Sequence, residues 1–429
     1  MSILAVMLIF VICLFIAIPV SISLGIVSVL PGAFDGSFTA SATYVVRSMV
    51  SGIDSFPLLA IPMFVLSGII MARGGVSKKL FDVFAYFIGK RRAGIPCAVI
   101  ITCLFYGAIS GSAPATVAAV GSMTIPILIH LGYDKVFSTA VVAVAGGLGV
   151  IIPPSIPYIL FAMASGESVS DLFMAGIIPG ILIALLLMGY AFYYCTKHGE
   201  DKEKINKEVE ALHEKGILKV LKESVWALLT PVIILGCIYG GIASPTEAAV
   251  ISVFYALFVS MVIYKSIHFK DINAILVEAC RTFAPLLFIL VASTAFSRVL
   301  TLMQVPQLIS EWILNSFTNE VLILLVINAF LLVVGMVMDT SPAILIVTPI
   351  LMPIIQGIGM DPIHFGIVMV INLAIGFVTP PIGVNLFVAS SLTDIPVMQI
   401  AKKAVPMIAF FLIALMIITF VPAISLALL

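Results

Sequence analysis

Two pairs of consecutive prolines, Pro153-Pro154 and Pro380-Pro381, each interrupt a long apolar segment. Proline has no N–H, so it cannot donate to the carbonyl four residues earlier in a helix. The first pair is therefore expected to free the carbonyl of Gly149, and the second that of Gly376. A free carbonyl is costly in an apolar medium, and a sodium ion can satisfy several at once. The pairs predict two cation-binding helix breaks; the alternative is a kink repaired by a Ser, a Thr or a neighbouring helix.

A stretch of small residues precedes each break. The first reads SGSAPAT (residues 110–116) and the second reads MDTSPA (residues 338–343). Each has proline at the expected first position of a helix. Helix N–H groups suit an anion, whereas hydroxyl oxygens and free carbonyls suit a cation. Asp339 is the only acid in either stretch. A carboxylate in an apolar region is a candidate functional group, although it could instead pair with a distant arginine.

Other polar motifs have structural explanations or are missing. Ser244-Pro245-Thr246-Glu247 fits a capping box, which makes Glu247 structural. Arg298 could hold a solute carboxylate, or could reach the membrane surface or pair with an acid. The sequence has no HExxH and no GxxxxGK[ST], and its six cysteines form no CxxC. ATP-driven transport by this chain, a metal cluster and a disulfide framework are therefore not expected.

The proline positions reveal an internal duplication. Pro380 follows Pro153 by 227 residues, and four proline pairs share this spacing. Roughly 0.6 such coincidences would arise by chance at one offset. Three further pairs agree to within one residue: Pro19 with Pro245, Pro57 with Pro285, and Pro114 with Pro342. The chain is therefore expected to contain two copies of one half, each with a broken helix, an organisation typical of transporters.

The composition indicates a membrane protein. Apolar residues make up 62% of the 429 residues and charged residues 10%, against roughly 45–50% and 25% in soluble domains. Residues 1–30 contain no Lys or Arg and are apolar for longer than the core of a signal peptide. They predict a first transmembrane helix that is retained. The net charge is zero and there is no basic run, so nucleic acid is not an expected partner.

The pattern predicts an all-α polytopic membrane protein made of two repeats. The first repeat covers 1–196, with a re-entrant hairpin at about 110–132 and a broken helix at about 137–166. A charged linker covers 197–224. The second repeat covers 225–429, with a hairpin at about 338–359 and a broken helix at about 362–392. Segments 76–92 and 266–282 mix charged and apolar residues, which predicts equivalent interfacial helices. Parallel and inverted repeats both remain open, and we favour inverted ones.

Five stretches carry a family resemblance: SGSAPATVAAVGS (110–122), GGLGVIIPPSIP (146–157), GIASPTEAAV (241–250), MDTSPAILIVTPILMP (338–353) and NLAIGFVTPPIGVNLFV (372–388). Together they resemble the large membrane (M) subunit of tripartite ATP-independent periplasmic (TRAP) transporters. The resemblance implies an elevator-type secondary transporter of the bacterial inner membrane. It implies as partners a small four-helix membrane subunit, a soluble periplasmic substrate-binding protein and membrane lipid. Its activity would be sodium-coupled uptake of a carboxylate-bearing solute. The chain is most similar to sialic acid (N-acetylneuraminate) systems, and next to C4-dicarboxylate systems.

The same resemblance assigns residues by position. One sodium site would use Ser110 with the backbone oxygens of Gly149, Ile152 and Pro154. A second would use Gly376, Thr379 and Pro381. The solute would lie near Ser112, Ser155, Asp339, Thr340 and Asn385.

Two other readings compete with this one. A stand-alone sodium:anion symporter would have a related architecture and no partners. A channel or an intramembrane enzyme would belong to another class, but no credible catalytic pair is present, so an enzyme is not expected.

Overall fold

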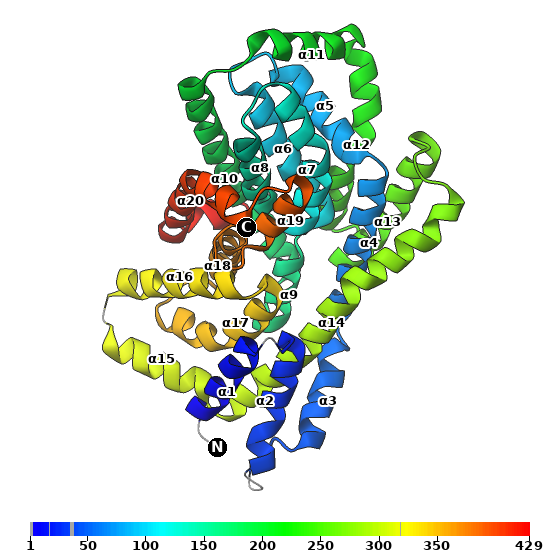
Figure 1. Cartoon of the computed structure of the whole chain (residues 1–429). Coiled ribbons are helices and arrows are strands. Elements are labelled where there is room, and N and C mark those ends of the chain that lie inside the picture. Colours follow the sequence, from blue (N-terminus) through cyan, green and yellow to red (C-terminus); the bar gives the residue numbers. More distant parts are fainter. Residues whose placement is uncertain (1–2, 17, 35–37, 318) are drawn as a thin grey trace.

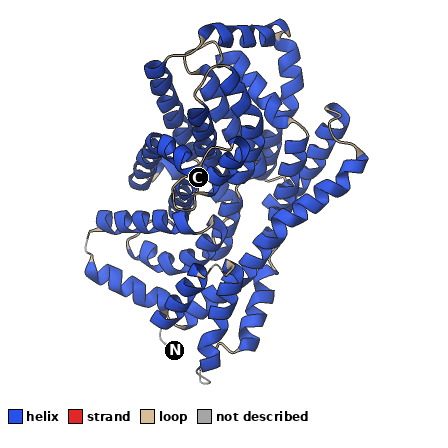
Figure 2. Ribbon diagram, in the orientation of Figure 1, coloured by secondary structure: helices blue, strands red, loops and turns tan. Residues whose placement is uncertain are grey.

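A computed structural model describes residues 3–16, 18–34, 38–317 and 319–429. The described residues form helices and contain no strand (Figure 2). Within them, nine helices are long and apolar enough to cross a membrane. These features confirm the prediction of an all-α polytopic membrane protein.

The first half contains ten α-helices and two short 3-10 turns. They are α1 (Ile3–Phe15), α2 (Val20–Phe34), α3 (Ala42–Ile53), η1 (Phe56–Leu59), α4 (Ala60–Arg73), α5 (Val76–Ile88), α6 (Gly94–Ser110), α7 (Ala113–His130), α8 (Lys135–Ala145), η2 (Gly146–Val150), α9 (Ile156–Ser165) and α10 (Val169–His198).

The remaining helices follow in the same order. They are α11 (Lys202–Glu214), α12 (Ile217–Tyr239), α13 (Pro245–Phe258), the π-helical turn η3 (Val259–Ile263), the 3-10 turn η4 (Phe269–Asp271), α14 (Ile272–Leu302), α15 (Val305–Ser316), α16 (Glu320–Val337), α17 (Thr340–Gly357), α18 (Pro362–Gly376), α19 (Val384–Thr393), α20 (Val397–Phe420) and α21 (Ala423–Leu426).

The helix bounds repeat with the spacing of the prolines. Adding 227 to the bounds of α7 gives 340–357, which are the bounds of α17. The same shift places α6 inside α16 and α8 inside α18. Each half therefore contains a hairpin, α6–α7 or α16–α17, followed by a helix that ends at a Pro-Pro pair.

The broken helices lie in the interior. Every residue from Phe137 to Ala145 of α8 is buried, and so is every residue from His364 to Gly376 of α18. Figure 1 shows α18 between α16 and α20, and α14 running past α4 toward α2 and α3. A helix that is apolar on all sides is stable when other helices surround it, which explains why α8 and α18 form the core.

Two expectations about individual segments are wrong. Residues 1–30 do not form one helix, because α1 ends at Phe15 and α2 begins at Val20, just after Pro19; residues 1–2 and 17 lie outside the described residues. Proline disfavours helical backbone in the residue before it, which explains the break. Residues 266–282 are not a separate interfacial helix, since α14 is continuous from Ile272 to Leu302. At the shift of 227 the counterpart of α5 is α15.

The charged linker is folded and docked. Ile205, Val209 and Leu212 on one face of α11 are buried, and His213 lies 3.0 Å from the carbonyl oxygen of Tyr86 in α5. The linker is therefore packed against the first half of the chain.

A buried carboxylate fixes the start of the linker. The Glu200 side chain is 2% exposed. It accepts hydrogen bonds from the Tyr133 hydroxyl at 2.6 Å and from the backbone N–H of Ala93 at 3.0 Å. Burial, and then the hydrogen bond to Glu200, raise the pKa of Tyr133. The hydroxyl therefore stays protonated and donates throughout the physiological pH range. Glu200 thus joins the residue before α6 to the turn after α7.

Close backbone contacts between glycines hold the hairpins against the broken helices. A Cβ on Gly376 would lie 2.3 Å from the carbonyl carbon of Gly335 in α16. In the first half, a Cβ on Gly107 of α6 would lie 2.6 Å from the Cα of Gly149. Glycine is required at these crossings because any side chain would meet backbone, which has little room to move.

Glu200→Ala should release the linker from the first half. Hydrogen bonds to a charged group contribute about 1.5–3 kcal/mol each, and their loss leaves the Ala93 N–H unpaired. We expect trypsin to cleave after Lys202, Lys204 or Lys207 at least about tenfold faster than in the unchanged chain. Glu203→Ala, at an exposed position in the first turn of α11, is the control. Equal cleavage rates in the two variants would contradict the role of Glu200.

Gly376→Ala should disrupt the crossing of α16 and α18. Overpacking costs about 1–3 kcal/mol when side chains can adjust, and here the new methyl group meets the backbone of Gly335. We expect a lower thermal unfolding midpoint for the purified protein. Gly189→Ala in α10 is the matched control, because a Cβ there would meet nothing within 4 Å. A Gly376→Ala protein as stable as Gly189→Ala would show that the crossing is not tight.

Candidate functional site

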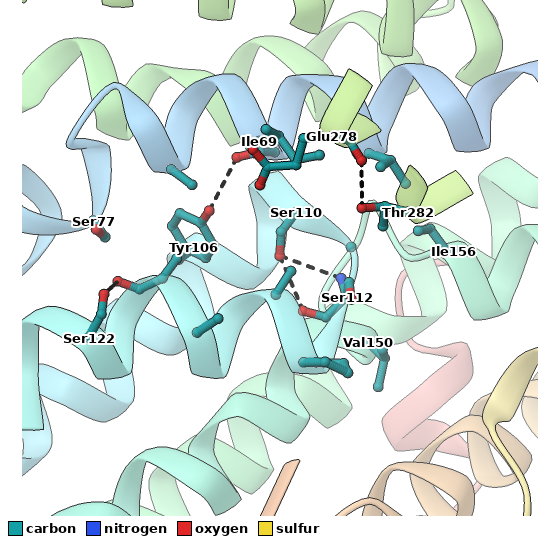
Figure 3. Close-up of a pocket in the computed structure, with 18 of the residues that line it drawn as sticks. Ile69, Ser77, Tyr106, Ser110, Ser112, Ser122, Val150, Ile156, Glu278 and Thr282 are labelled. Carbon is teal, nitrogen blue, oxygen red and sulfur yellow. Dashed lines mark hydrogen bonds between the residues drawn. The ribbon is translucent and has the colours of Figure 1, made fainter. Parts of the chain in front are cut away.

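A cavity of about 760 Å³ lies where the two hairpin tips face each other. The first tip contributes Ser110, Gly111 and Ser112, and the second contributes Asp339, Thr340 and Ser341. Helices α4, α5, α9 and α14 also contribute to the wall, and Figure 3 shows Glu278 and Thr282 of α14 among the lining residues with Ser110 and Ser112 of the first tip. The cavity therefore brings together both hairpins and helices that lie outside them.

The first tip is a cluster of oxygen atoms. The Ser110 and Thr116 hydroxyl oxygens are 3.0 Å apart, and the Thr116 hydroxyl donates to the carbonyl of Ser112 at 2.8 Å. The Ser112 N–H points back to the Ser110 oxygen at 3.4 Å. Gly111 has a φ of 60°, a left-handed conformation that glycine adopts readily, and it turns the chain between α6 and α7.

The first broken helix runs directly against this cluster. A Cβ on Gly149 would lie 2.4 Å from the Thr116 hydroxyl oxygen and 2.7 Å from the Ser112 carbonyl oxygen. The Pro154 carbonyl oxygen would lie 2.9 Å from a Cβ on Gly111. The absence of side chains at Gly111 and Gly149 thus lets three sources of oxygen converge: the tip hydroxyls, the tip carbonyls and the carbonyls beside the Pro-Pro pair.

The carbonyls released by the first Pro-Pro pair differ from each other. The Ser155 hydroxyl donates to the Val150 carbonyl at 2.5 Å, which is the serine repair considered above as an alternative. The Ile152 N–H donates to Leu148. Among the described residues, no hydrogen bond reaches the Gly149 carbonyl oxygen. Gly149 therefore presents an open acceptor, as the sequence predicted.

The second break is more completely hydrogen-bonded. The Thr379 N–H donates to the Gly376 carbonyl at 3.1 Å, and the Asn385 N–H donates to the Phe377 carbonyl at 3.0 Å. The Thr379 hydroxyl donates to Ile375 at 2.7 Å. A carbonyl oxygen has two lone pairs, so a bonded carbonyl can still hold a cation. The prediction that Gly376 is left without a hydrogen bond is wrong, because the chain bends into a turn that supplies the missing donor.

The predicted solute residues fall into two groups. Ser112, Asp339 and Thr340 line the cavity. The Asp339 carboxylate accepts from the Thr340 N–H at 2.8 Å and so caps α17. Ser155 and Asn385 are fully buried and are not part of the cavity wall. The Asn385 side chain donates to the Ala143 carbonyl at 3.1 Å.

The remaining sodium predictions lie around the two breaks. Ile152 is buried and its side chain packs beside Gly180 of α10. Pro381 is exposed. Among the described residues, no hydrogen bond joins the carbonyl of either residue to a hairpin tip.

Sequence reasoning missed several residues of the site. Thr116 lies one helical turn after Ser112, and this i, i+4 spacing could have identified it. Arg73, Lys78 and Glu278 also line the cavity. Glu278 was missed because residues 266–282, which contain it, were predicted to form an interfacial helix. Among the described residues, no group of three or more His, Cys, Asp or Glu side chains is placed to hold a metal ion.

The structure confirms the predicted capping box and places Arg298 outside the cavity. Ser244 and Glu247 form the expected capping box, with the Ser244 N–H donating to the Glu247 carboxylate at 2.7 Å. Arg298 donates to the Ser51 hydroxyl at 2.7 Å and does not line the cavity.

Comparison with known proteins gives one family. The chain matches the model described as "Tripartite ATP-independent periplasmic transporter, DctM component" over residues 7–424. It is 43% identical to the isethionate TRAP transporter permease protein DctMQ of Oleidesulfovibrio alaskensis, over 97% of this chain and 64% of that protein. It therefore spans about two thirds of the length of that relative.

Other relatives are matched over most of their length. The chain is 39% identical to the C4-dicarboxylate TRAP transporter large permease protein DctM of Pseudomonas aeruginosa, over 87% of this chain and 86% of that protein. It is 35% identical to the 2,3-diketo-L-gulonate TRAP transporter large permease protein YiaN of Escherichia coli, over 88% and 87%.

Among solved structures, the fold is similar to that of the YdaH transporter of Alcanivorax borkumensis, with a TM-score of 0.63 over 93% of this chain and 95% of that one. The sequence identity is 14%, so this likeness shows the fold alone. The family match and the permease relatives agree with the duplicated broken helices and the cavity between the hairpin tips. The chain belongs to the DctM family of large membrane permease subunits of TRAP transporters, which carry solutes and are not enzymes.

Proposed function

We propose that this subunit carries out sodium-coupled uptake of an acid-bearing solute through the cavity between the hairpin tips. The observation that carries the proposal is the close approach of Gly149 to the paired hydroxyls of Ser110 and Thr116, together with a Gly149 carbonyl that accepts no hydrogen bond among the described residues. Sodium prefers several oxygen ligands, and a hydroxyl, a free carbonyl and nearby tip carbonyls supply them without a charged side chain. The ligands of this first site would be Ser110, Thr116, Gly149, Ile152 and Pro154.

A second sodium would bind at the other break, through backbone oxygens of Gly376, Thr379 and Pro381. The Ile382 N–H donates to the Met336 carbonyl at 3.3 Å, which holds this turn against the end of α16. Met338 stands where the first half has a polar tip residue, so the second site would depend more on backbone oxygen than the first.

The solute would be a small organic acid. The named relatives are permeases for isethionate, C4-dicarboxylates and 2,3-diketo-L-gulonate, all of which are anions at neutral pH. Sialic acid, which the sequence suggested, and a C4-dicarboxylate are the two specific candidates. The cavity of about 760 Å³ is large enough for either.

We further propose that the working transporter includes a small four-helix membrane subunit and a periplasmic binding protein in the bacterial inner membrane. The hairpins and broken helices would move as one body against the remaining helices, in an elevator cycle. A stand-alone sodium:anion symporter is the competing arrangement. Proteoliposomes containing this chain alone should be inactive under our proposal and active under that one.

Coupling can be tested by replacing sodium. In proteoliposomes with both partners, we expect uptake of the loaded solute to need an inward sodium gradient. Choline in place of sodium should reduce the initial rate to background, because the oxygen cluster cannot coordinate a quaternary ammonium ion closely. Undiminished uptake in choline would refute sodium coupling and leave the family assignment intact.

The first site can be tested with Ser110→Ala. Removing one oxygen ligand should raise the sodium concentration for half-maximal uptake by roughly tenfold, the equivalent of about 1.4 kcal/mol. Ser244→Ala removes a hydroxyl that caps α13, far from the tips, and should leave the sodium dependence unchanged. Equal sodium dependence in the two variants would exclude Ser110 as a ligand.

A further inference from the structure

The cavity contains an ion pair that the sequence did not reveal. Its wall includes four charged side chains: Arg73, Lys78, Glu278 and Asp339. Arg73 of α4 donates a hydrogen bond to the carboxylate of Glu278 in α14. The two side chains are 42% and 45% exposed. The pair is therefore half-exposed and lines the cavity, where a solute acid group can reach it.

The position of Arg73 is fixed by its backbone and not by the ion pair. Arg73 is the last residue of α4, where a positive charge is favoured by the helix dipole. The next residue, Gly74, packs so closely that a Cβ would lie 2.3 Å from the Ser260 hydroxyl. The Ser266 hydroxyl also donates to the Gly74 carbonyl at 3.1 Å. The backbone of Arg73 is thus held beside the cavity independently of Glu278, and the guanidinium group stays within side-chain reach of it.

The cavity wall carries balanced charges, of which only Arg73 and Glu278 are paired with each other in the described part of the chain. Arg73 and Lys78 supply two positive charges, and Glu278 and Asp339 supply two negative ones. Lys78 makes no ion pair within 4 Å among the described residues, although Asp82, one turn further along α5, lies close enough to interact with it. Lys78 can therefore attract a solute anion without any exchange, whereas the Arg73 guanidinium becomes available to the anion only if Glu278 leaves it.

We propose that Glu278 occupies the anion-binding position of Arg73 in the empty carrier, and that the acid group of the solute displaces it. This inference rests on the proposed function and adds a residue that recognises the solute. A guanidinium group has a planar fork of donors that binds a carboxylate or a sulfonate through two parallel hydrogen bonds. Glu278 then turns toward solvent, which is inexpensive for a side chain that is already half-exposed.

The exchange gives Glu278 a specific effect. A carboxylate held next to Arg73 competes with every solute anion, so it weakens binding and helps release. It also gives Arg73 a counter-ion when no solute is bound, so that the empty cavity does not hold an unpaired arginine charge. If the ion pair served only to hold α4 against α14, it would instead remain intact when the solute binds.

The test uses proteoliposomes that contain this chain, the small subunit and the binding protein, with radiolabelled succinate, isethionate or N-acetylneuraminate as probes. Glu278→Gln should lower the KM for the transported probe by about three- to tenfold, because the competing carboxylate is gone. Arg73→Gln should raise KM at least tenfold, and Arg73→Lys should give an intermediate value because it keeps the charge and loses the fork.

Exchanging the charges of Arg73 and Glu278 distinguishes a role in solute binding from a role in holding α4 against α14. Arg73→Glu combined with Glu278→Arg restores an ion pair between α4 and α14, so we expect normal thermal stability and uptake near background. Full uptake by this double variant would overturn the inference, as would wild-type KM values for Arg73→Gln. Lys90→Gln and Glu210→Gln break a pair of similar exposure away from the cavity and should leave KM unchanged. Loss of sodium dependence in the unchanged chain refutes the proposed function instead, so the two failures are distinguishable.

Discussion

A backbone carbonyl in an apolar medium must have a partner, and this requirement shapes both halves of the subunit. The Pro-Pro pairs remove backbone donors from the innermost helices, where water is not at hand to replace them. The carbonyls that lose their helical donors are found in three different situations. A serine hydroxyl satisfies Val150, a tight turn satisfies Gly376 and Phe377, and Gly149 is left as an acceptor beside the hydroxyls of the first tip.

The duplication therefore produces two breaks with different chemistry. The first combines hydroxyl groups with an open carbonyl, and the second is closed by its own backbone and carries Asp339 on the opposing tip. At the shift of 227, α7 and α17 share their bounds to the residue although most of their residues differ, so the repeat has kept the helix positions while the groups at the tips have changed. In both halves, close contacts between glycines set where the hairpin helix crosses the broken helix. Other residues of these helices could therefore change without altering how the helices cross.

The sequence was informative wherever a local rule operates. Proline spacing predicted the duplication, and the Ser244 capping box and the hairpin bounds follow from helix-end chemistry. It failed where helices continue through charged residues: the segment around Glu278 has the composition of a membrane surface, yet it belongs to a 31-residue helix. The ion pair with Arg73 joins residues 205 positions apart, and no periodicity in one sequence can predict a contact of that range.

The docked linker bears on how the two halves can be displaced relative to each other. Glu200 holds the start of the linker to the base of the first hairpin, and His213 holds its far end to α5. The segment from Gly199 to Glu214 is thereby committed to the first half, and only Lys215 and Gly216 separate it from α12. Gly216 has a φ of 77°. A connection that looks long enough in sequence to let the halves slide apart is held at both ends, and α12 continues the attachment because the Ser224 hydroxyl donates to the Lys79 carbonyl of α5 at 2.8 Å.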